Sequence, residues 1–349
     1  MIIDLRLDGN KYRQIELESA KSIRDILKDT DIPADTILSF KIDHTQYVNE
    51  EFIPQHSMLI DCITFNHPEG SRIYQDSAIF ILAKAVSSLL GIQHSLVVEH
   101  SIGDGVFCEV FGAQRWTEQD CNRVKEEMIK IVESDLPIDK ITVPISEALE
   151  IFSTMGRKDV IKNLKYNYRD EVSIYRCGKY YDIFLRPLAD RTGRVKEFDI
   201  VYQEPGFILR FPTGKECKLA QPFVFPKKLF QLHQEHDKWL DILGVHNIID
   251  VNKLTDNYDI SEFILVEEAL HEKKIAEIAA AIVSEPKIKL ILIAGPSSSG
   301  KTTFAKRLSI QLLACKTKPV MISLDDYFID REKTVRKENG EYDFESIYA

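Results

Sequence analysis

Residues 66–91 read "NHPEGSRIYQDSAIFILAKAVSSLLG", and the pattern of the chain changes at this stretch. Apolar side chains recur here at helical spacing and share one face: Ile79, Leu82, Ala83, Val86 and Leu90. Gly91 follows the last of them, where a glycine commonly ends a helix. The stretch therefore predicts one long helix, and we expect a second domain to begin with it.

The residues in front of this helix form a compact unit of their own. Residues 2–7, 37–43 and 57–65 have the composition of strands, and residues 22–29 predict a short helix. We expect a small mixed fold of ubiquitin-like size over residues 1–65. Its 7 Lys and Arg face 12 Asp and Glu, so tRNA binding by this part alone is disfavoured.

Strands and helices also alternate behind the long helix. Residues 95–111 predict a hairpin around Gly103 and Gly105, and Thr117 is placed to cap the helix that follows it. A second helix is predicted over 146–156, strands are predicted within 172–212, and residues 226–286 predict a helical connector. Residues 151–200 hold 11 Lys and Arg against 7 Asp and Glu. This basic stretch could face RNA or nucleotide, although the pattern favours an ordinary solvated surface.

Residues 291–303, "ILIAGPSSSGKTT", contain a full match to the phosphate-binding pattern G-x-x-x-x-G-K-[ST]. An apolar run before it predicts a buried strand, and the residues after it predict a helix. The loop amides and the helix N-terminus would hold the phosphates of ATP or GTP. Lys301 would reach the β- and γ-phosphates, and Thr302 would bind Mg²⁺. The expected contacts come from Gly295, Ser297, Ser298, Ser299, Gly300, Lys301, Thr302 and Thr303; the alternative is a Gly/Ser turn without a ligand.

A second predicted strand, residues 318–324, ends at Asp325. In open parallel sheets ligands bind beyond the carboxyl ends of the strands, so this carboxylate should project toward the phosphates. It could accept a proton from an attacking hydroxyl group. A helix cap or a solvated turn is the alternative reading of the same residue.

The motifs "GPSSSGKTTFAKRL", "ISLDDYF" and "YDFES" resemble the start of the uridine kinase and phosphoribulokinase family. The resemblance covers about residues 287–349 and implies an α/β P-loop domain that phosphorylates a nucleoside 5′-hydroxyl group. It implies that Asp325 and Lys301 are catalytic, that Phe328 lies near the nucleobase and that Glu345 binds the ribose. Ser346 and Ile347 stand where the family has His-Pro. Because a P-loop kinase needs more strands and a lid, we expect this chain to be an incomplete and inactive part of such an enzyme.

The front half resembles two domains of threonyl-tRNA synthetases, on stretches that include "SAIFILAKAVSSLLG", "GDGVFCEV" and "YYDIFLRP". The resemblance divides the chain into a TGS-like domain (1–65), a region like the second additional domain of the synthetases (66–225), the connector (226–286) and the start of a P-loop domain (287–349). The expected fold class is α+β, followed by the first part of an α/β domain. In the synthetases, an H-x-x-x-H pair and a C-x-x-x-H pair remove mischarged amino acids. These positions fall on Asp76, Phe80, Phe184 and Leu188, so we expect a scaffold without editing chemistry.

Composition narrows the class of protein. The 349 residues carry a net charge of -10, which disfavours broad attraction to nucleic acid. No C-x-x-C pair and no apolar run of membrane length stand out, which predicts a cytoplasmic protein with reduced thiols and no membrane partner. The expected partners are a nucleoside and a nucleotide, with RNA left open but not favoured. Two alternatives remain: a TGS-containing regulatory GTPase, or a non-catalytic RNA-binding relative of the synthetase editing domain.

Overall fold

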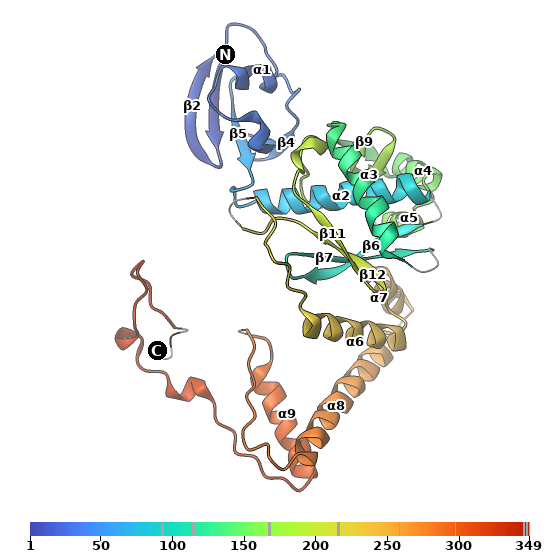
Figure 1. Ribbon diagram of the computed structural model, residues 1–349, viewed down its shortest axis with the longest axis vertical. Coiled ribbons are helices and arrows are strands. Elements are labelled where there is room, and N and C mark those ends of the chain that lie inside the picture. Colours follow the sequence, from blue (N-terminus) through green and yellow to red (C-terminus); the bar gives the residue numbers. More distant parts are fainter. Residues whose placement is uncertain are drawn as a thin grey trace. The chain divides into compact units, whose positions relative to one another are not determined.

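The computed structural model describes residues 1–91, 94–112, 116–166, 169–214, 217–257, 259–296, 298–344, 346 and 348. The chain divides into two compact units, Met1–Lys238 and Trp239–Ala349. Figure 1 shows the elements in chain order. Several sheets and helices make up the first unit, which confirms the α+β class expected for the front half.

A five-stranded sheet in the order β2-β1-β5-β3-β4 forms the N-terminal part. Its strands are β1 (Ile2–Leu7), β2 (Asn10–Glu16), β3 (Ile37–Ile42), β4 (Gln46–Val48) and β5 (Met58–Thr64). The central strand β5 pairs in parallel with β1 and antiparallel with β3. Helix α1 (Ile23–Lys28) begins at Ser22, whose side chain accepts a hydrogen bond from the Asp25 N–H, and a 3₁₀ turn, η1 (Ala34–Thr36), precedes β3. Ile3, Ile26 and Ile60 are fully buried in the core of this part.

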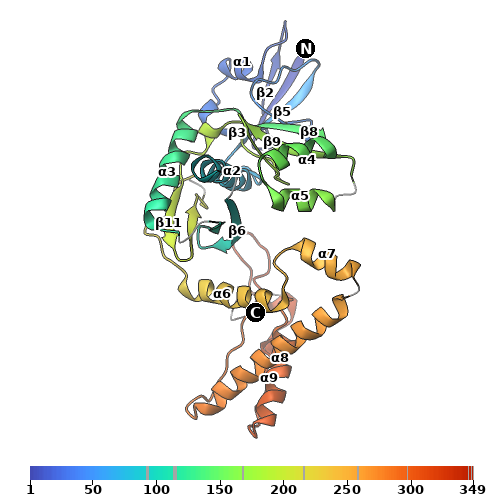
Figure 2. The ribbon, with the colours of Figure 1, turned by 90° about the vertical axis from the view of Figure 1, so that its right-hand side faces the viewer.

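Helix α2 (Gly70–Leu90) is the central element of the next part, and it ends at Gly91 as predicted. The predicted apolar face is wrong in detail, because Leu82 and Val86 are buried whereas Ile79, Ala83 and Leu90 are only partly so. The reason is that α2 packs on more than one side. Ile81 and Leu82 belong to one apolar cluster, and Phe80 belongs to another. Figure 2 looks nearly along α2 and shows elements on several sides of it.

One of these neighbours is a four-stranded antiparallel sheet in the order β11-β12-β7-β6. Its strands are β6 (Ser95–Ile102), β7 (Gly105–Phe111), β11 (Asp199–Gln203) and β12 (Gly206–Arg210). The predicted hairpin around Gly103 joins β6 to β7. Helix α3 (Glu118–Glu133) begins with the capping box of Thr117 and Asp120, which confirms the predicted cap.

The other neighbour is a three-stranded sheet in the order β10-β9-β8. It contains β8 (Asp139–Pro144), β9 (Glu171–Cys177) and β10 (Tyr180–Asp182), with helices α4 (Ile145–Thr154) and α5 (Lys158–Lys165) between β8 and β9. A 3₁₀ turn, η2 (Thr192–Arg194), follows β10. Phe152, Val160 and Ile174 bury the contact between these helices and the sheet.

Helices dominate the rest of the described chain. They are α6 (Lys227–Leu243), α7 (Ile248–Asp256), α8 (Ile260–Ser284) and α9 (Lys301–Ala314), followed by the 3₁₀ turns η3 (Leu324–Tyr327) and η4 (Arg331–Lys333). In the second unit α9 packs on α8 through Ile275, Ala279, Leu308 and Leu312. Glu272 of α8 accepts hydrogen bonds from Arg307 at 3.0 Å and from Gln311 at 2.6 Å.

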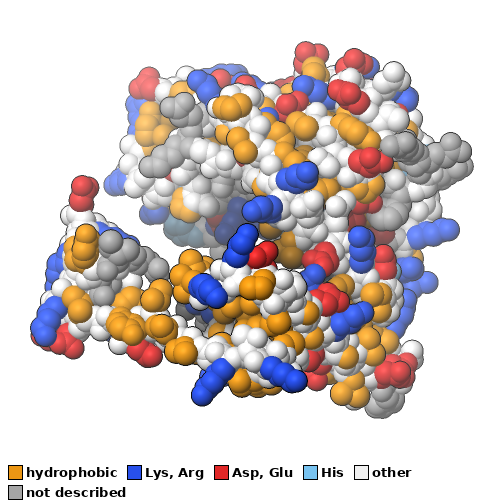
Figure 3. Space-filling view, turned by 60° about the horizontal axis from the view of Figure 1, so that its bottom comes forward, with side chains coloured by type: hydrophobic (Ala, Val, Ile, Leu, Met, Phe, Trp, Pro, Cys, Tyr) orange, Lys and Arg blue, Asp and Glu red, His pale blue; other side chains and the backbone are white. Residues whose placement is uncertain are grey.

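The two strands predicted around the phosphate loop are not formed. The described residues within 288–296 and 318–323 form no β-pairs. Leu290, Leu292, Val320 and Ile322 are 67–85% exposed, and Figure 3 shows hydrophobic side chains on the molecular surface. A strand needs a neighbour to accept its backbone hydrogen bonds, and none is present for these segments in the described chain. An α/β P-loop domain is therefore not shown.

One helix among the described residues is long and apolar enough to cross a membrane. It is α2, with a mean hydropathy of 1.3 over its most apolar window, so the expectation that no such run exists is corrected. More than half of that window, 56%, is buried inside the protein. This burial is the pattern of a core helix.

Candidate functional sites

The four positions that the resemblance aligns with the editing residues lie around α2 and the segment after β10. Asp76 lies on α2 and is buried, and both of its carboxylate oxygens accept hydrogen bonds from Arg186 at 2.6 Å. These two residues stand 110 positions apart in the chain. Asp76 is the only polar residue at the four positions, and the Arg186 guanidinium group holds both of its oxygens in a bidentate ion pair.

The other three positions are filled with apolar side chains. The rings of Phe80 and Phe184 meet edge to face with centroids 5.9 Å apart, and Tyr180 contacts Phe80 at 5.4 Å. Leu188 is 3% exposed in the same cluster. The side chains of Phe80, Phe184 and Leu188 can neither bind a metal nor transfer a proton. Across the described residues, no cluster of three or more His, Cys, Asp or Glu side chains could hold a metal ion.

His233 and His236 stand three residues apart on α6, a spacing at which two histidines can bind one metal ion, but the described residues supply no further ligand. His233 of α6 stacks on His100 of β6, with ring centroids 3.6 Å apart and planes 8° apart. Burial and the neighbouring His233 lower the pKa of His100. The stack lies beside Phe107 and Phe230, so these rings help to pack α6 against the four-stranded sheet.

The phosphate-loop residues form a closed turn before α9. Gly300 has a φ of 84°, which favours glycine, and directly precedes the first helical residue, Lys301. The Lys301 ammonium group donates to the carbonyl oxygens of Gly295 at 2.8 Å and Pro296 at 2.9 Å. A Cβ atom on Gly295 would approach the Ser299 Oγ to 2.7 Å. The loop thus folds tightly around the lysine, and Thr302 and Thr303 are exposed at the start of α9.

The remaining predicted site residues are only partly described. Phe328 follows η3 and is 56% exposed. Asp325 lies within η3, but its side chain falls outside the description, and Ser297 and Glu345 lie outside the described residues. The roles assigned to these four residues stay predictions.

A charged network joins the N-terminal part to the segment around η2, and no sequence pattern predicted it. Glu50 accepts from Arg24, from Arg191 at 2.7 Å and from Arg194 at 3.0 Å. Arg194 also pairs with the buried Asp190 at 2.9 Å. Burial opposes ionisation of Glu50, but the arginines outweigh it and lower its pKa; burial raises the pKa of Asp190 despite Arg194.

Helix α5 carries a row of lysines on its exposed side. Lys158, Lys162 and Lys165 follow one another at intervals of four and three residues, so they share one face. All three are exposed, and the described residues provide no ion-pair partner for them. The opposite face buries Val160 and Leu164. This α5 lysine face lies inside the basic stretch noted in the sequence.

Comparison with known proteins identifies threonine–tRNA ligases as relatives. The chain is 26% identical over 235 residues to the threonine–tRNA ligase of Carboxydothermus hydrogenoformans, covering 65% of this chain and 36% of the relative. It is 30% identical over 213 residues to that of Desulforamulus reducens, covering 61% and 32%. The chain thus spans about a third of the length of these relatives. No family model matches the chain.

These relatives correct the functional prediction. They are tRNA ligases, a different enzyme class from nucleoside kinases, so the prediction of a uridine-type kinase is wrong, as are the kinase and transferase assignments. The resemblance of the front half to the TGS and editing-like region agrees with the relatives. Since their names describe ligases that act on tRNA, the expectation that disfavoured RNA as a partner is revised.

Proposed function

We propose that the front of the chain is a non-catalytic, RNA-binding relative of the editing region of threonine–tRNA ligases. The TGS-like (1–65) and editing-like (66–225) bounds are part of this proposal. The observation that carries it is the α5 lysine face, which stands on a domain whose hydrolytic positions are filled by Phe80, Phe184 and Leu188. A domain that keeps its architecture and an open cationic face, but not its hydrolytic groups, retains the means to bind without the means to cleave.

The α5 lysine face has the geometry to follow a nucleic-acid backbone. Lys158 and Lys165 are seven residues apart, which corresponds to about 10 Å along a helix at 1.5 Å per residue. Because no acidic partner of these lysines is described, their charge is free to pair with phosphates. Because the whole chain carries a net negative charge, we expect nucleic-acid binding only at this local basic face.

The test is an RNA titration at several salt concentrations. In the triple variant Lys158→Glu, Lys162→Glu, Lys165→Glu, affinity for a tRNA acceptor-stem hairpin should fall by at least about tenfold, and the salt slope should drop by about two to three. A control with the same change in net charge, Lys11→Glu, Lys227→Glu, Lys228→Glu, alters exposed lysines elsewhere. Equal losses in both triple variants would show that only net charge matters, and unchanged binding in the α5 variant would refute the proposal.

The turn before α9 favours a second function, the binding of a nucleotide. The residues fit the phosphates of ATP or another nucleoside triphosphate, because Lys301 already lies within the loop and Gly295 permits the close approach of Ser299. Thr302 would bind Mg²⁺, which neutralises phosphate charge when bound. Asp325, Phe328 and Glu345 stay candidates for contacts to the nucleotide. We also propose that the protein is cytoplasmic.

Calorimetric titration with Mg-ATP tests the nucleotide site. Lys301→Ala should weaken binding by about 10- to 100-fold, the value of a charge-assisted contact. Lys306→Ala, on the same helix and exposed, should bind as the parent does. If both variants bind Mg-ATP equally well, the loop is a structural turn.

A further inference from the structure

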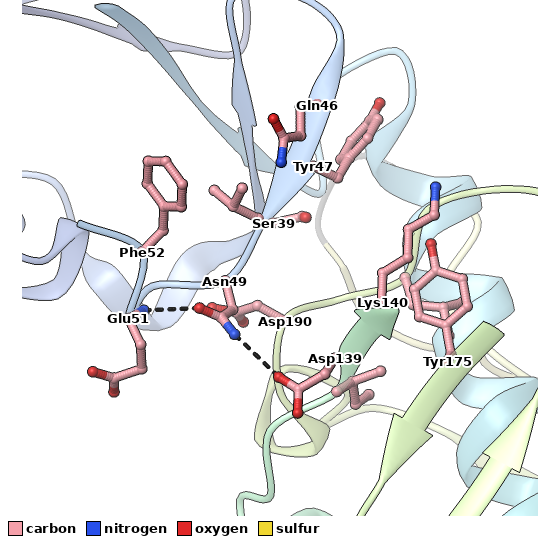
Figure 4. Close-up of a pocket in the computed structure, with 13 residues that line it drawn as sticks. Ser39, Gln46, Tyr47, Asn49, Glu51, Phe52, Asp139, Lys140, Tyr175 and Asp190 are labelled. Carbon is pink, nitrogen blue, oxygen red and sulfur yellow. Dashed lines mark hydrogen bonds between the residues drawn. The ribbon is translucent and has the colours of Figure 1, made fainter. Parts of the chain in front are cut away.

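A cavity of about 270 Å³ lies within the first unit, between the N-terminal sheet and the three-stranded sheet. Figure 4 shows Ser39, Gln46 and Tyr47 on one side of it and Lys140 with Tyr175 on the other. The two sides are joined by a hydrogen bond of 3.2 Å from the Asn49 amide to Asp139. This junction cavity is separate from the editing positions, apart from Leu188, which lines both.

The carboxylates around the junction cavity are already neutralised. Asp139 pairs with Arg176 at 3.0 Å, and Asp190 pairs with Arg194 at 2.9 Å. Glu51 pairs with Arg24 at 2.9 Å. Each of these three carboxylates is therefore paired with an arginine, although Arg24 and Arg194 also pair with Glu50, and none of the three is left unpaired to attract a cationic ligand.

Two other polar groups of the lining have no partner in the described part of the chain. The hydroxyl group of Ser39 belongs to a residue that is 2% exposed, and it neither donates nor accepts a hydrogen bond there. The Lys140 ammonium group, at the exposed edge of β8, has no ion pair. The Ser39 oxygen is accessible from the cavity rather than sealed in the core, so it can donate a hydrogen bond to a ligand oxygen.

The rest of the wall is apolar. Ile138, Leu188 and the Tyr175 ring are each less than 7% exposed, and Val48 and Phe52 line the opposite side. The volume lies just below the range of about 300–1,000 Å³ typical of drug-sized ligands. An occupant is therefore small, with a flat or compact apolar body and one polar end.

We propose that the junction cavity binds a small organic monocarboxylate with an aromatic or branched apolar body. The single unpaired cation, Lys140, matches one negative charge, and the Ser39 hydroxyl group donates to the same carboxylate. The apolar body packs on Tyr175, Ile138 and Leu188. A phosphate monoester fits less well, because its second negative charge would meet the carboxylates of Asp139 and Asp190 without a second free cation.

The experiment uses the full chain and benzoate as the probe. Saturation-transfer NMR and calorimetry measure the binding. Benzoate should bind, and its neutral isostere benzamide and the dianion phenyl phosphate should bind at least tenfold more weakly. Lys140→Met should weaken benzoate binding by about 10- to 100-fold, and Ser39→Ala by about 2- to 10-fold. Lys179→Met, an exposed lysine that does not line the cavity, is the matched control and should have no effect.

Each contrary outcome rejects a defined part of the proposal. Absence of benzoate binding at millimolar concentration, or equal binding by the Lys140→Met and parent proteins, would overturn the site. Tighter binding of phenyl phosphate would overturn the assignment of a monocarboxylate. Circular dichroism of each variant establishes that it is folded, and because Lys140 is exposed, its substitution separates loss of binding from loss of structure.

Discussion

Two runs of β-forming residues meet opposite fates in this molecule. Strand β5, in the first unit, pairs with β1 and β3 and buries Ile60 and Ile63 completely. Residues 318–324, in the second unit, have a similar apolar composition but leave Val320 and Ile322 85% and 67% exposed. The difference shows that apolar composition selects a segment for burial, whereas a strand forms only where neighbours complete its hydrogen bonds.

The largest expected effect comes from shortening matched isoleucines in these two runs. Ile60→Ala should lower the free energy of unfolding by about 2–5 kcal/mol, because it removes a fully buried side chain and leaves a cavity. Ile322→Ala should change it by no more than about 0.5 kcal/mol, as expected for an exposed position. Urea unfolding measured by circular dichroism gives both values.

Hydrogen exchange checks the same comparison without mutation. Backbone amides of 58–64 should be protected, and those of 318–324 should exchange at nearly the rate of an unfolded peptide. Strong protection of 318–324, or a large loss of stability in Ile322→Ala, would show that this run is paired and buried in solution.

A smaller effect is expected from the charged network that holds the first unit together. Glu50→Gln should lower the free energy of unfolding by about 1–3 kcal/mol near pH 7, because three arginines lose their shared carboxylate. The arginines lower the pKa of Glu50, so its contribution is present above its unfolded pKa of about 4.3 and is lost as the pH falls through the folded pKa. The gap between parent and variant should therefore close on acidification below about pH 4.3.

The control for this prediction is the neighbouring Glu51→Gln. Glu51 is more than half exposed and pairs only with Arg24 among the described arginines, so its loss should cost less than about 1 kcal/mol. Acidification affects Asp190 in the opposite direction to Glu50. Burial raises the pKa of Asp190, so its protonation at low pH stabilises the fold. The Glu50 carboxylate helps to raise the pKa of Asp190, so Asp190 titrates differently in the parent and in Glu50→Gln; closing of the gap is assigned to this network when the Glu51→Gln control does not show it. A gap that widens at low pH would contradict the assignment.

Local patterns predicted the elements that local physics controls. The Thr117 cap, the Gly91 helix end and the hairpin at Gly103 were readable because each depends on a few adjacent residues. Strand β2 was missed because its residues are almost all exposed and show no apolar alternation. The face of α2 was misjudged because apolar layers cover two of its sides, which a single helical stripe does not reveal.

The candidate sites also divide into one built from adjacent residues, which the sequence predicted, and others built from distant residues, which it did not. The turn around Lys301 followed from a contiguous motif, and the structure shows its lysine held by loop carbonyls. The Asp76–Arg186 pair, the Glu50 network and the junction cavity each join residues that are distant in the chain. No spacing rule connects such positions, because their meeting is decided by tertiary packing. Aligning the editing positions by resemblance gave the residue types but not the ion pair that accompanies them.

The smallest expected effect concerns catalysis. It tests whether the editing positions, which carry other side chains, have any hydrolytic activity. The parent chain should not deacylate mischarged threonine tRNA above the uncatalysed rate. Hydrolysis requires a positioned base or a metal-bound water, and the four editing positions offer only Asp76, whose oxygens are both held by Arg186. Release of radiolabelled serine from seryl-tRNA(Thr), with a threonine–tRNA ligase as the positive control, measures this rate. Asp76→Asn should leave it at background. Deacylation by the parent that disappears in Asp76→Asn would mean that the Arg186 pair opens to expose a working carboxylate, and the front would then be an enzyme rather than a binding scaffold.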